Sequence, residues 1–151
     1  MMRSIFFPPD QKPVRNLPVD QFERCVAQPD GLLWVILEEA SSTEIQAILG
    51  DVFHFHPLTI EDCINAGYQT PKIDDFGDYL FLIAHAIRPG AEIKEETVKE
   101  LDLFLGPNYV VTLSPESNMP PVDKTWALLE KDQRIHQGGS DFLCHAILDI
   151  L

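Results

Sequence analysis

Residues 32–37 read Leu-Leu-Trp-Val-Ile-Leu and directly follow Gly31. This run is shorter than a typical helix, is rich in residues that favour strands, and is apolar at every position. Because a strand points alternate side chains to opposite faces of a sheet, both faces of this one must be covered. The segment therefore predicts a central strand. It also falls far short of the roughly 20 apolar residues that a membrane-spanning helix needs.

Four further segments predict strands around this one. Met2–Phe7 is a short strand that ends at two prolines, and Pro71–Ile87 contains the strongest alternating pattern. Thr97–Leu105 and Tyr109–Leu113 follow, separated by Gly-Pro-Asn at residues 106–108. Since this composition is typical of turns, we expect these last two strands to form an antiparallel hairpin.

Helical spacing of apolar residues, together with capping residues and prolines, also predicts helices. They are expected at Asp20–Ala27, Ser41–Val52, Pro57–Gly67, Val122–Gln137 and Ser140–Leu151. Interleaved strands and helices indicate an α/β fold, which we predict to be an α/β/α sandwich. Its central mixed β-sheet should contain the antiparallel hairpin and carry helices on both faces.

Length and chain end bear on the organisation of the protein. Residues 1–151 are expected to form a single domain, because domains usually contain about 100–200 residues. The last predicted helix has no Gly, Pro or basic residue that would stop it. We therefore expect the chain to be the N-terminal part of a longer protein.

The composition is strongly acidic, with 24 Asp and Glu against 11 Lys and Arg and a net charge of −13. Nucleic acids and anionic membrane surfaces are poor partners for such a chain, because both attract clustered Lys and Arg. Three widely spaced cysteines and no recognisable signal peptide predict free thiols in a reducing, cytoplasmic environment.

Several histidines and cysteines suggest chemistry but are better explained by structure. His54 and His56 precede a helix start, where capping and packing account for them better than metal binding does. Cys144 and His145 are neighbours on a predicted helix, so their side chains diverge by about 100° and cannot form a dyad. His85 lies within a strand among apolar residues and is expected to be a core histidine. No phosphate-binding glycine motif is present, and we expect no enzyme.

Carboxylates are the most informative side chains. One cluster runs through residues 92–102 and contains Glu92, Glu95, Glu96, Glu100 and Asp102; Asp74, Asp75 and Asp78 form another. Mg²⁺ prefers oxygen ligands, keeps several waters and often takes only one or two carboxylates from a protein. These acids could supply a weak hydrated site, although for each residue a solvated acidic loop is the simpler interpretation.

An ordered series of motifs resembles a known family. Residues 56–65 read His-Pro-Leu-Thr-Ile-Glu-Asp-Cys-Ile-Asn, residues 69–73 read Gln-Thr-Pro-Lys-Ile, and residues 78–82 read Asp-Tyr-Leu-Phe-Leu. This order resembles the N-terminal cytoplasmic domain of the CorA family of divalent-cation transporters, and the resemblance extends over essentially the whole chain. In this motif Pro57 would start a helix with Glu61 and Asp62 on its exposed side, so the signature would encode a fold rather than a catalytic site.

The resemblance implies a homopentameric transporter of Mg²⁺ and Co²⁺ at the inner membrane. In that family a long stalk helix and two membrane spans follow this domain, and a Gly-Met-Asn loop selects the ion. These 151 residues contain no Gly-Met-Asn, so they would sense metal and gate the pore rather than conduct ions. Regulatory ions in the family lie between neighbouring cytoplasmic domains. By that resemblance Glu92 and Glu95 are the candidate metal residues, with weak or absent Mg²⁺ binding by this part alone.

Two alternatives remain open from the sequence. The zinc-transporting branch of the family shares the domain plan, and the motifs do not separate Zn²⁺ from Mg²⁺. A standalone protein-interaction module is the alternative from a different class. In a transporter, whichever ion it carries, the membrane would be contacted only through segments beyond Leu151.

Overall fold

The computed structural model describes residues 1–65, 67, 69–87, 90–94 and 97–151. These residues form a seven-stranded sheet in the order β2-β1-β3-β7-β6-β5-β4. The strands are β1 (Met2–Phe7), β2 (Val14–Arg15), β3 (Leu32–Glu38), β4 (Lys72–Asp75), β5 (Leu80–Ile87), β6 (Val98–Leu105) and β7 (Tyr109–Ser114).

The sheet is mixed. β3 and β7 are parallel, with Leu33 beside Tyr109, whereas the other neighbouring strands are antiparallel. β6 and β7 form the predicted hairpin across residues 106–108. All seven residues of β3 are buried between β1 and β7, which confirms the prediction of a central strand.

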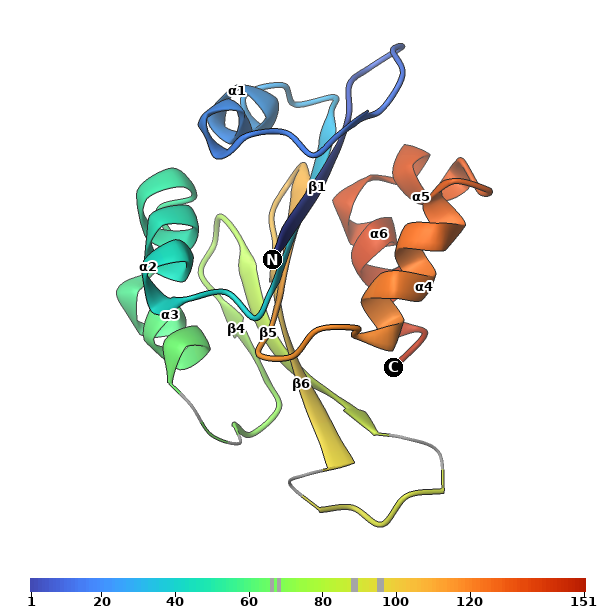
Figure 1. Cartoon of the computed structure of the whole chain (residues 1–151). Helices are drawn as coiled ribbons and strands as arrows, with labels where there is room; N and C mark the ends of the chain where they lie inside the picture. Colours follow the sequence, from blue (N-terminus) through green and yellow to red (C-terminus); the bar gives the residue numbers. More distant parts are fainter. Residues whose placement is uncertain (66, 68, 88–89, 95–96) are drawn as a thin grey trace.

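Helices cover both faces of the sheet, as Figure 1 shows, so the predicted α/β/α arrangement is confirmed. One layer contains a short 3₁₀ turn, η1 (Val19–Gln21), α1 (Phe22–Val26), α2 (Ser42–Ile45), the π-helical η2 (Gln46–Val52) and α3 (Pro57–Ile64). The opposite layer contains α4 (Pro120–Leu129), α5 (Arg134–Gln137) and α6 (Gly139–Leu148).

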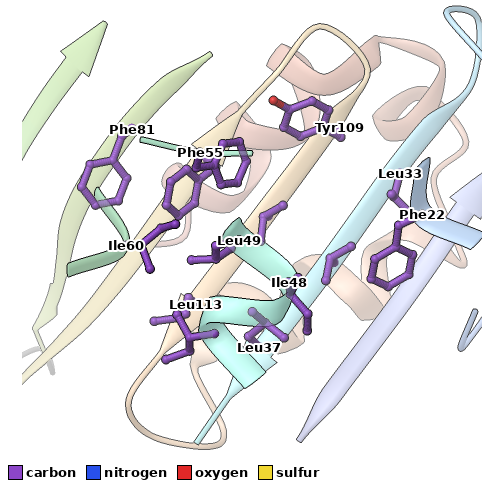
Figure 2. Packing of buried hydrophobic residues seen from close by; sticks show 14 of the residues in the cluster. Phe22, Leu33, Leu37, Ile48, Leu49, Phe55, Ile60, Phe81, Tyr109 and Leu113 are labelled. Atoms are coloured by element: carbon purple, nitrogen blue, oxygen red, sulfur yellow. The ribbon is translucent and has the colours of Figure 1, made fainter. Parts of the chain in front are cut away.

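The alternation of β3 divides the hydrophobic core into two clusters. Leu33, Val35 and Leu37 face the α2–α3 layer, and Trp34 faces the α4–α6 layer. Figure 2 shows the first cluster, where Phe55 lies among buried side chains from the sheet and from the helices. The two faces of one apolar strand thus hold both helical layers in place.

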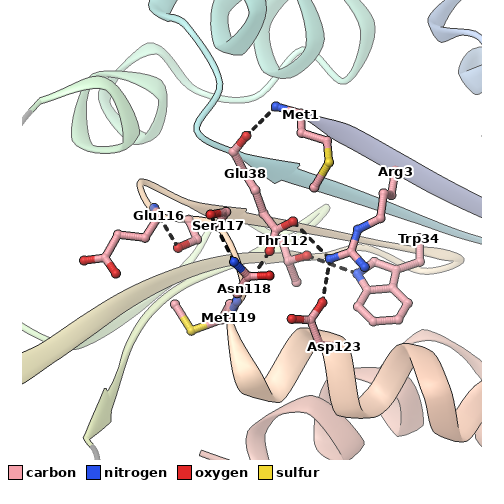
Figure 3. A network of polar contacts seen from close by, with 11 residues as sticks. Met1, Arg3, Trp34, Glu38, Thr112, Glu116, Ser117, Asn118, Met119 and Asp123 are labelled. Atoms are coloured by element: carbon pink, nitrogen blue, oxygen red, sulfur yellow. Dashed lines mark hydrogen bonds and ion pairs between the residues drawn. The ribbon is translucent and has the colours of Figure 1, made fainter.

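A buried ion pair joins the sheet to the second layer (Figure 3). Glu38 at the end of β3 is 1% exposed, and its Oε2 lies 3.0 Å from Nη2 of Arg3. The same guanidinium lies 2.9 Å from Oδ1 of Asp123 on α4. Its Cζ is also 5.5 Å from the ring centroid of Trp126. Arg3 therefore connects β1, β3 and α4.

One predicted segment contains an additional strand, and one predicted helix is divided. The segment 71–87, predicted to contain one strand, contains β4 as well as β5, because Gly77 at φ +83° and a hydrogen bond from its N–H to Oδ1 of Asp75 make a turn between them. The helix expected at 122–137 ends at Leu129 and resumes at Arg134, whose N–H donates to Oδ1 of Asp132. Such side-chain acceptors compete with continuous helical hydrogen bonding.

Of two predicted helix starts, one is capped by the expected residue and the other is not. Ser41 caps α2 at the start of the helix predicted from Ser41, and with Glu44 it forms a reciprocal capping box. Asp20 does not cap α1, because it lies within η1 and α1 begins at Phe22 without a side-chain cap. The prediction of a helix capped by Asp20 is therefore wrong.

Candidate functional site

The segment between β5 and β6 carries Glu92 and Glu95, the candidate metal residues from the sequence analysis. Glu92 is strongly exposed, with 81% of its side chain accessible, and its Oε2 lies 2.8 Å from Nζ of Lys94. Its backbone carbonyl accepts a hydrogen bond from Oγ1 of Thr97 at 2.6 Å. Glu95 lies outside the described residues. The Glu92 carboxylate is thus available to a partner in solution, while the pairing of Glu92 with Glu95 stays a prediction.

The second acidic cluster has structural partners. Oδ2 of Asp74 lies 3.1 Å from Nζ of Lys72, and Oδ1 of Asp75 accepts the turn hydrogen bond from Gly77. Among the residues that the structure describes, no three His, Cys, Asp or Glu side chains are placed to hold one metal ion. Asp75 therefore stabilises the β4–β5 turn, and Asp74 pairs with Lys72 of the same strand.

The histidine and proline before α3 build the start of that helix. Nδ1 of His56 accepts a hydrogen bond from the N–H of Leu58 at 3.1 Å, and Pro57 occupies the first turn. The N–H of His56 donates to Oη of Tyr79 at 2.8 Å, which ties the helix start to the β4–β5 turn. The expected capping role of His56 is confirmed.

The segment 69–72 holds α3 against the sheet. Nε2 of Gln69 donates to the carbonyl of Asp62 at 2.9 Å, and its N–H donates to Oε2 of Glu100 at 3.0 Å. Nζ of Lys72 donates to Oδ2 of Asp62 at 2.8 Å. Asp62 is half-buried and paired rather than fully exposed, because Lys72 reaches it from β4. The motif therefore encodes contacts between a helix, a loop and two strands.

A buried polar cluster lies beneath α3, although a solvated acidic loop was the simpler interpretation of its acids from the sequence. Asp102 on β6 is 1% exposed and lies next to Cys63 of α3. The Glu100 side chain is 15% exposed, and its Oε2 lies 3.9 Å from Nε2 of His85. His85 is 8% exposed, consistent with the expected core histidine.

The pKa values of this cluster are shifted by its environment. Burial, and next the neighbouring Glu100 carboxylate, raise the pKa of Asp102 to about 8. Burial also raises the pKa of Glu100, against a hydrogen bond from Gln69 that lowers it. The pKa of the Cys63 thiol is raised by burial and by Asp102. A signal for this cluster exists in the sequence, since Glu100 and Asp102 share a strand face with Phe104.

The side chains of Cys144 and His145 do not face each other. Cys144 is buried whereas His145 is exposed, so α6 directs them to different environments as predicted.

No helix among the described residues is both long and apolar enough to cross a membrane.

A family model described as CorA-like Mg²⁺ transporter protein matches residues 29–151. The chain belongs to this CorA-like family. The resemblance carried by the motifs at 56–82 is thereby confirmed.

Curated relatives of this CorA-like chain are described as metal ion transporters. The "Putative metal ion transporter YfjQ" of Bacillus subtilis (strain 168) is 34% identical over 141 residues, covering 91% of this chain and 40% of the relative. The "Cobalt/magnesium transport protein CorA" of Thermotoga maritima is 27% identical over 123 residues, covering 78% and 33%. The chain thus spans well under half the length of these relatives.

The fold is also found in a solved cytoplasmic domain. That of ZntB from Vibrio parahaemolyticus RIMD 2210633 aligns with a TM-score of 0.66 over 97% of this CorA-like chain and 56% of that chain. At 15% identity this likeness shows the fold alone. The architecture predicted for the CorA-like chain is therefore that of a known cytoplasmic domain.

Proposed function

We propose that this chain is the cytoplasmic cation-sensing and gating domain of a CorA-like transporter of Mg²⁺ and Co²⁺. The observation that carries the proposal is the family match over residues 29–151, and the name of the Thermotoga relative, a cobalt/magnesium transport protein, supports the choice of ions. The net charge of −13 favours divalent cations as ligands. The intact protein would be a homopentamer in the inner membrane, with this domain on the cytoplasmic side.

Glu92 and Glu95 are proposed to contribute the domain's half of a regulatory site between subunits. The exposure of Glu92 supports this, because a hydrated Mg²⁺ often takes only one or two carboxylates from a protein. Bound metal would bridge carboxylates of adjacent subunits and favour the closed pentamer. Without metal, two carboxylates 4 Å apart would repel by about 1–4 kcal/mol, depending on the effective dielectric. Several such interfaces together could shift a gate whose states differ by a few kcal/mol.

The domain boundary leads to the first prediction. We propose that residues 1–151 precede a stalk helix and membrane-spanning helices in the intact protein. The reading frame beyond the codon of Leu151 should encode a long charged helix and then two apolar spans, with Gly-Met-Asn at the end of the first. Sequencing the gene checks this. A stop codon directly after Leu151 would instead favour the alternative of a standalone interaction module.

The second prediction concerns regulation by Mg²⁺. In the intact transporter, Glu92→Gln should raise the internal Mg²⁺ concentration that half-inhibits uptake by roughly fivefold or more, the lower end of allosteric coupling. Glu92→Gln combined with Glu95→Gln should raise it further. Uptake into vesicles loaded with a Mg²⁺ series would measure this shift.

Glu116→Gln is the matched control for Glu92→Gln. Glu116 is also an exposed glutamate, and its Oε2 lies 3.0 Å from Nζ of Lys99. The control should leave the inhibition unchanged. If Mg²⁺ inhibited Glu92→Gln and the wild type equally, the assignment of Glu92 to the regulatory site would be wrong. Preferential uptake of Zn²⁺ over Mg²⁺ in the same vesicles would instead favour the alternative of a zinc transporter.

A further inference from the structure

Asp102 is a buried acid in the middle of β6, directly beneath α3. It is 1% exposed, and its Oδ1 has no hydrogen-bond partner in the described structure. An ionised carboxylate in such a place would need a close cation or several donors. The geometry therefore favours a neutral carboxylic acid.

Within the part of the chain that the structure describes, the charged or titratable groups around Asp102 come from four elements. They are Asp62 and Cys63 on α3, Lys72 on β4, His85 on β5 and Glu100 on β6. The single lysine among them already donates to Asp62 and Asp74, at 2.8 and 3.1 Å. The nearest acid along the strand is Glu100, which keeps two polar contacts of its own, with Gln69 and His85. Ionisation of Asp102 would thus add a second buried carboxylate to a largely acidic cluster.

We propose that Asp102 is a proton switch that controls how firmly α3 is attached to the sheet. With the proton bound, Asp102 is neutral and adds no charge beneath α3, whose Cys63 and Asp62 lie next to it. When the proton leaves to solvent, the Asp102 and Glu100 carboxylates repel each other beneath the helix and the attachment weakens. This switch acts within one domain and does not depend on the cation-sensing role.

The direction of the pH effect follows from linkage. The pKa of Asp102 is about 8 in the folded state, raised above the ordinary value of 3.8 that it regains when α3 detaches. Between these values the closed state holds one more proton than the open state, so closure is strongest at low pH and weakens as pH rises toward 8. One linked proton changes the closing equilibrium about tenfold per pH unit.

Labelling of the Cys63 thiol in this chain measures the attachment. The labelling rate at Cys63, read by mass spectrometry of the peptide and divided by the rate in the urea-unfolded chain at the same pH, gives its protection. Protection in the wild type should fall about tenfold per pH unit from pH 6 to near pH 8. In Asp102→Asn, the protection of Cys63 should not change with pH in this range. Asp74→Asn, which removes a half-exposed acid of β4, should behave as the wild type.

A second measurement needs no variant and stays informative if Asp102→Asn fails to fold. The carboxyl carbon of Asp102 can be followed by ¹³C NMR in the wild-type chain from pH 4 to pH 10. A titration midpoint above pH 7 supports the switch, and a midpoint in the ordinary range below pH 5 overturns it. Equal pH dependence of Cys63 protection in the wild type and in Asp102→Asn would also overturn it.

Discussion

Arg3→Met should lower the free energy of unfolding by about 3–5 kcal/mol, the usual cost of removing one partner from a buried ion pair. Glu38 is 1% exposed, and Arg3 is the cation that contacts it, at 3.0 Å. Among the described residues, the Glu38 carboxylate would then keep one long hydrogen bond of 3.5 Å, from the N–H of Met119. The penalty therefore comes from an unpaired buried charge. Urea unfolding at pH 7 measures it.

Arg15→Met is a matched control for this effect. Arg15 also lies over the Trp126 ring, at 5.2 Å, and pairs with Glu130 at 2.8 Å. Glu130 is 54% exposed, so this pair should contribute at most about 1 kcal/mol. Loss of the stacking on Trp126 is common to both variants. The difference between them isolates the buried charge of Glu38.

A double substitution separates charge burial from general disruption. Arg3→Met with Glu38→Leu removes both charges and should recover most of the stability lost by Arg3→Met alone. Two results would contradict the account. One is a loss in Arg3→Met no larger than that in Arg15→Met, and the other is a double variant as unstable as the single one.

The backbone architecture was predictable because its signals are local. The apolar run at 32–37 has no alternative to a buried strand, and Gly-Pro-Asn at 106–108 sits between two strands that then pair. The boundaries that were missed depend on one or two residues. The turn between β4 and β5 needs Asp75 together with Gly77, and Asp132 interrupts the α4–α5 segment, yet each aspartate resembles any other surface acid in the sequence.

In the candidate site too, features set by neighbours in the chain were predictable, and features set by distant contacts were not. His56 and Pro57 could be assigned to a helix start, since capping depends on near neighbours in the chain. Asp102 could not be separated from the exposed acids before it, because its burial depends on α3, which is some 40 residues earlier and covers only one face of β6. Glu92 was selected by family resemblance, and the structure adds that its carboxylate is exposed.

Phe55→Ala should lower the free energy of unfolding by about 3–5 kcal/mol, the range for deleting a buried aromatic ring. Phe55 is 4% exposed and lies just before His56, between η2 and α3 (Figure 2). Its ring stacks on Phe104 of β6, with centroids 4.2 Å apart, and lies 4.6 Å from Tyr79 and 5.3 Å from Phe53. Aromatic pairs of this kind contribute about 0.5–1.5 kcal/mol beyond their buried area.

The position of Phe55 also predicts which part of the domain loosens. Because its ring joins the residues before α3 to β6, the amides of α3 in Phe55→Ala should exchange with solvent faster than those of α6 on the opposite face of the sheet. Phe55→Leu keeps much of the volume and should lose less stability than Phe55→Ala. Leu58→Ala, on α3 but 62% exposed, should stay within about 0.5 kcal/mol of the wild type. If Phe55→Ala were no less stable than Leu58→Ala, or if its exchange rose equally in both layers, α3 would be held by its polar contacts with Gln69, Lys72 and Asp102 rather than by this aromatic cluster.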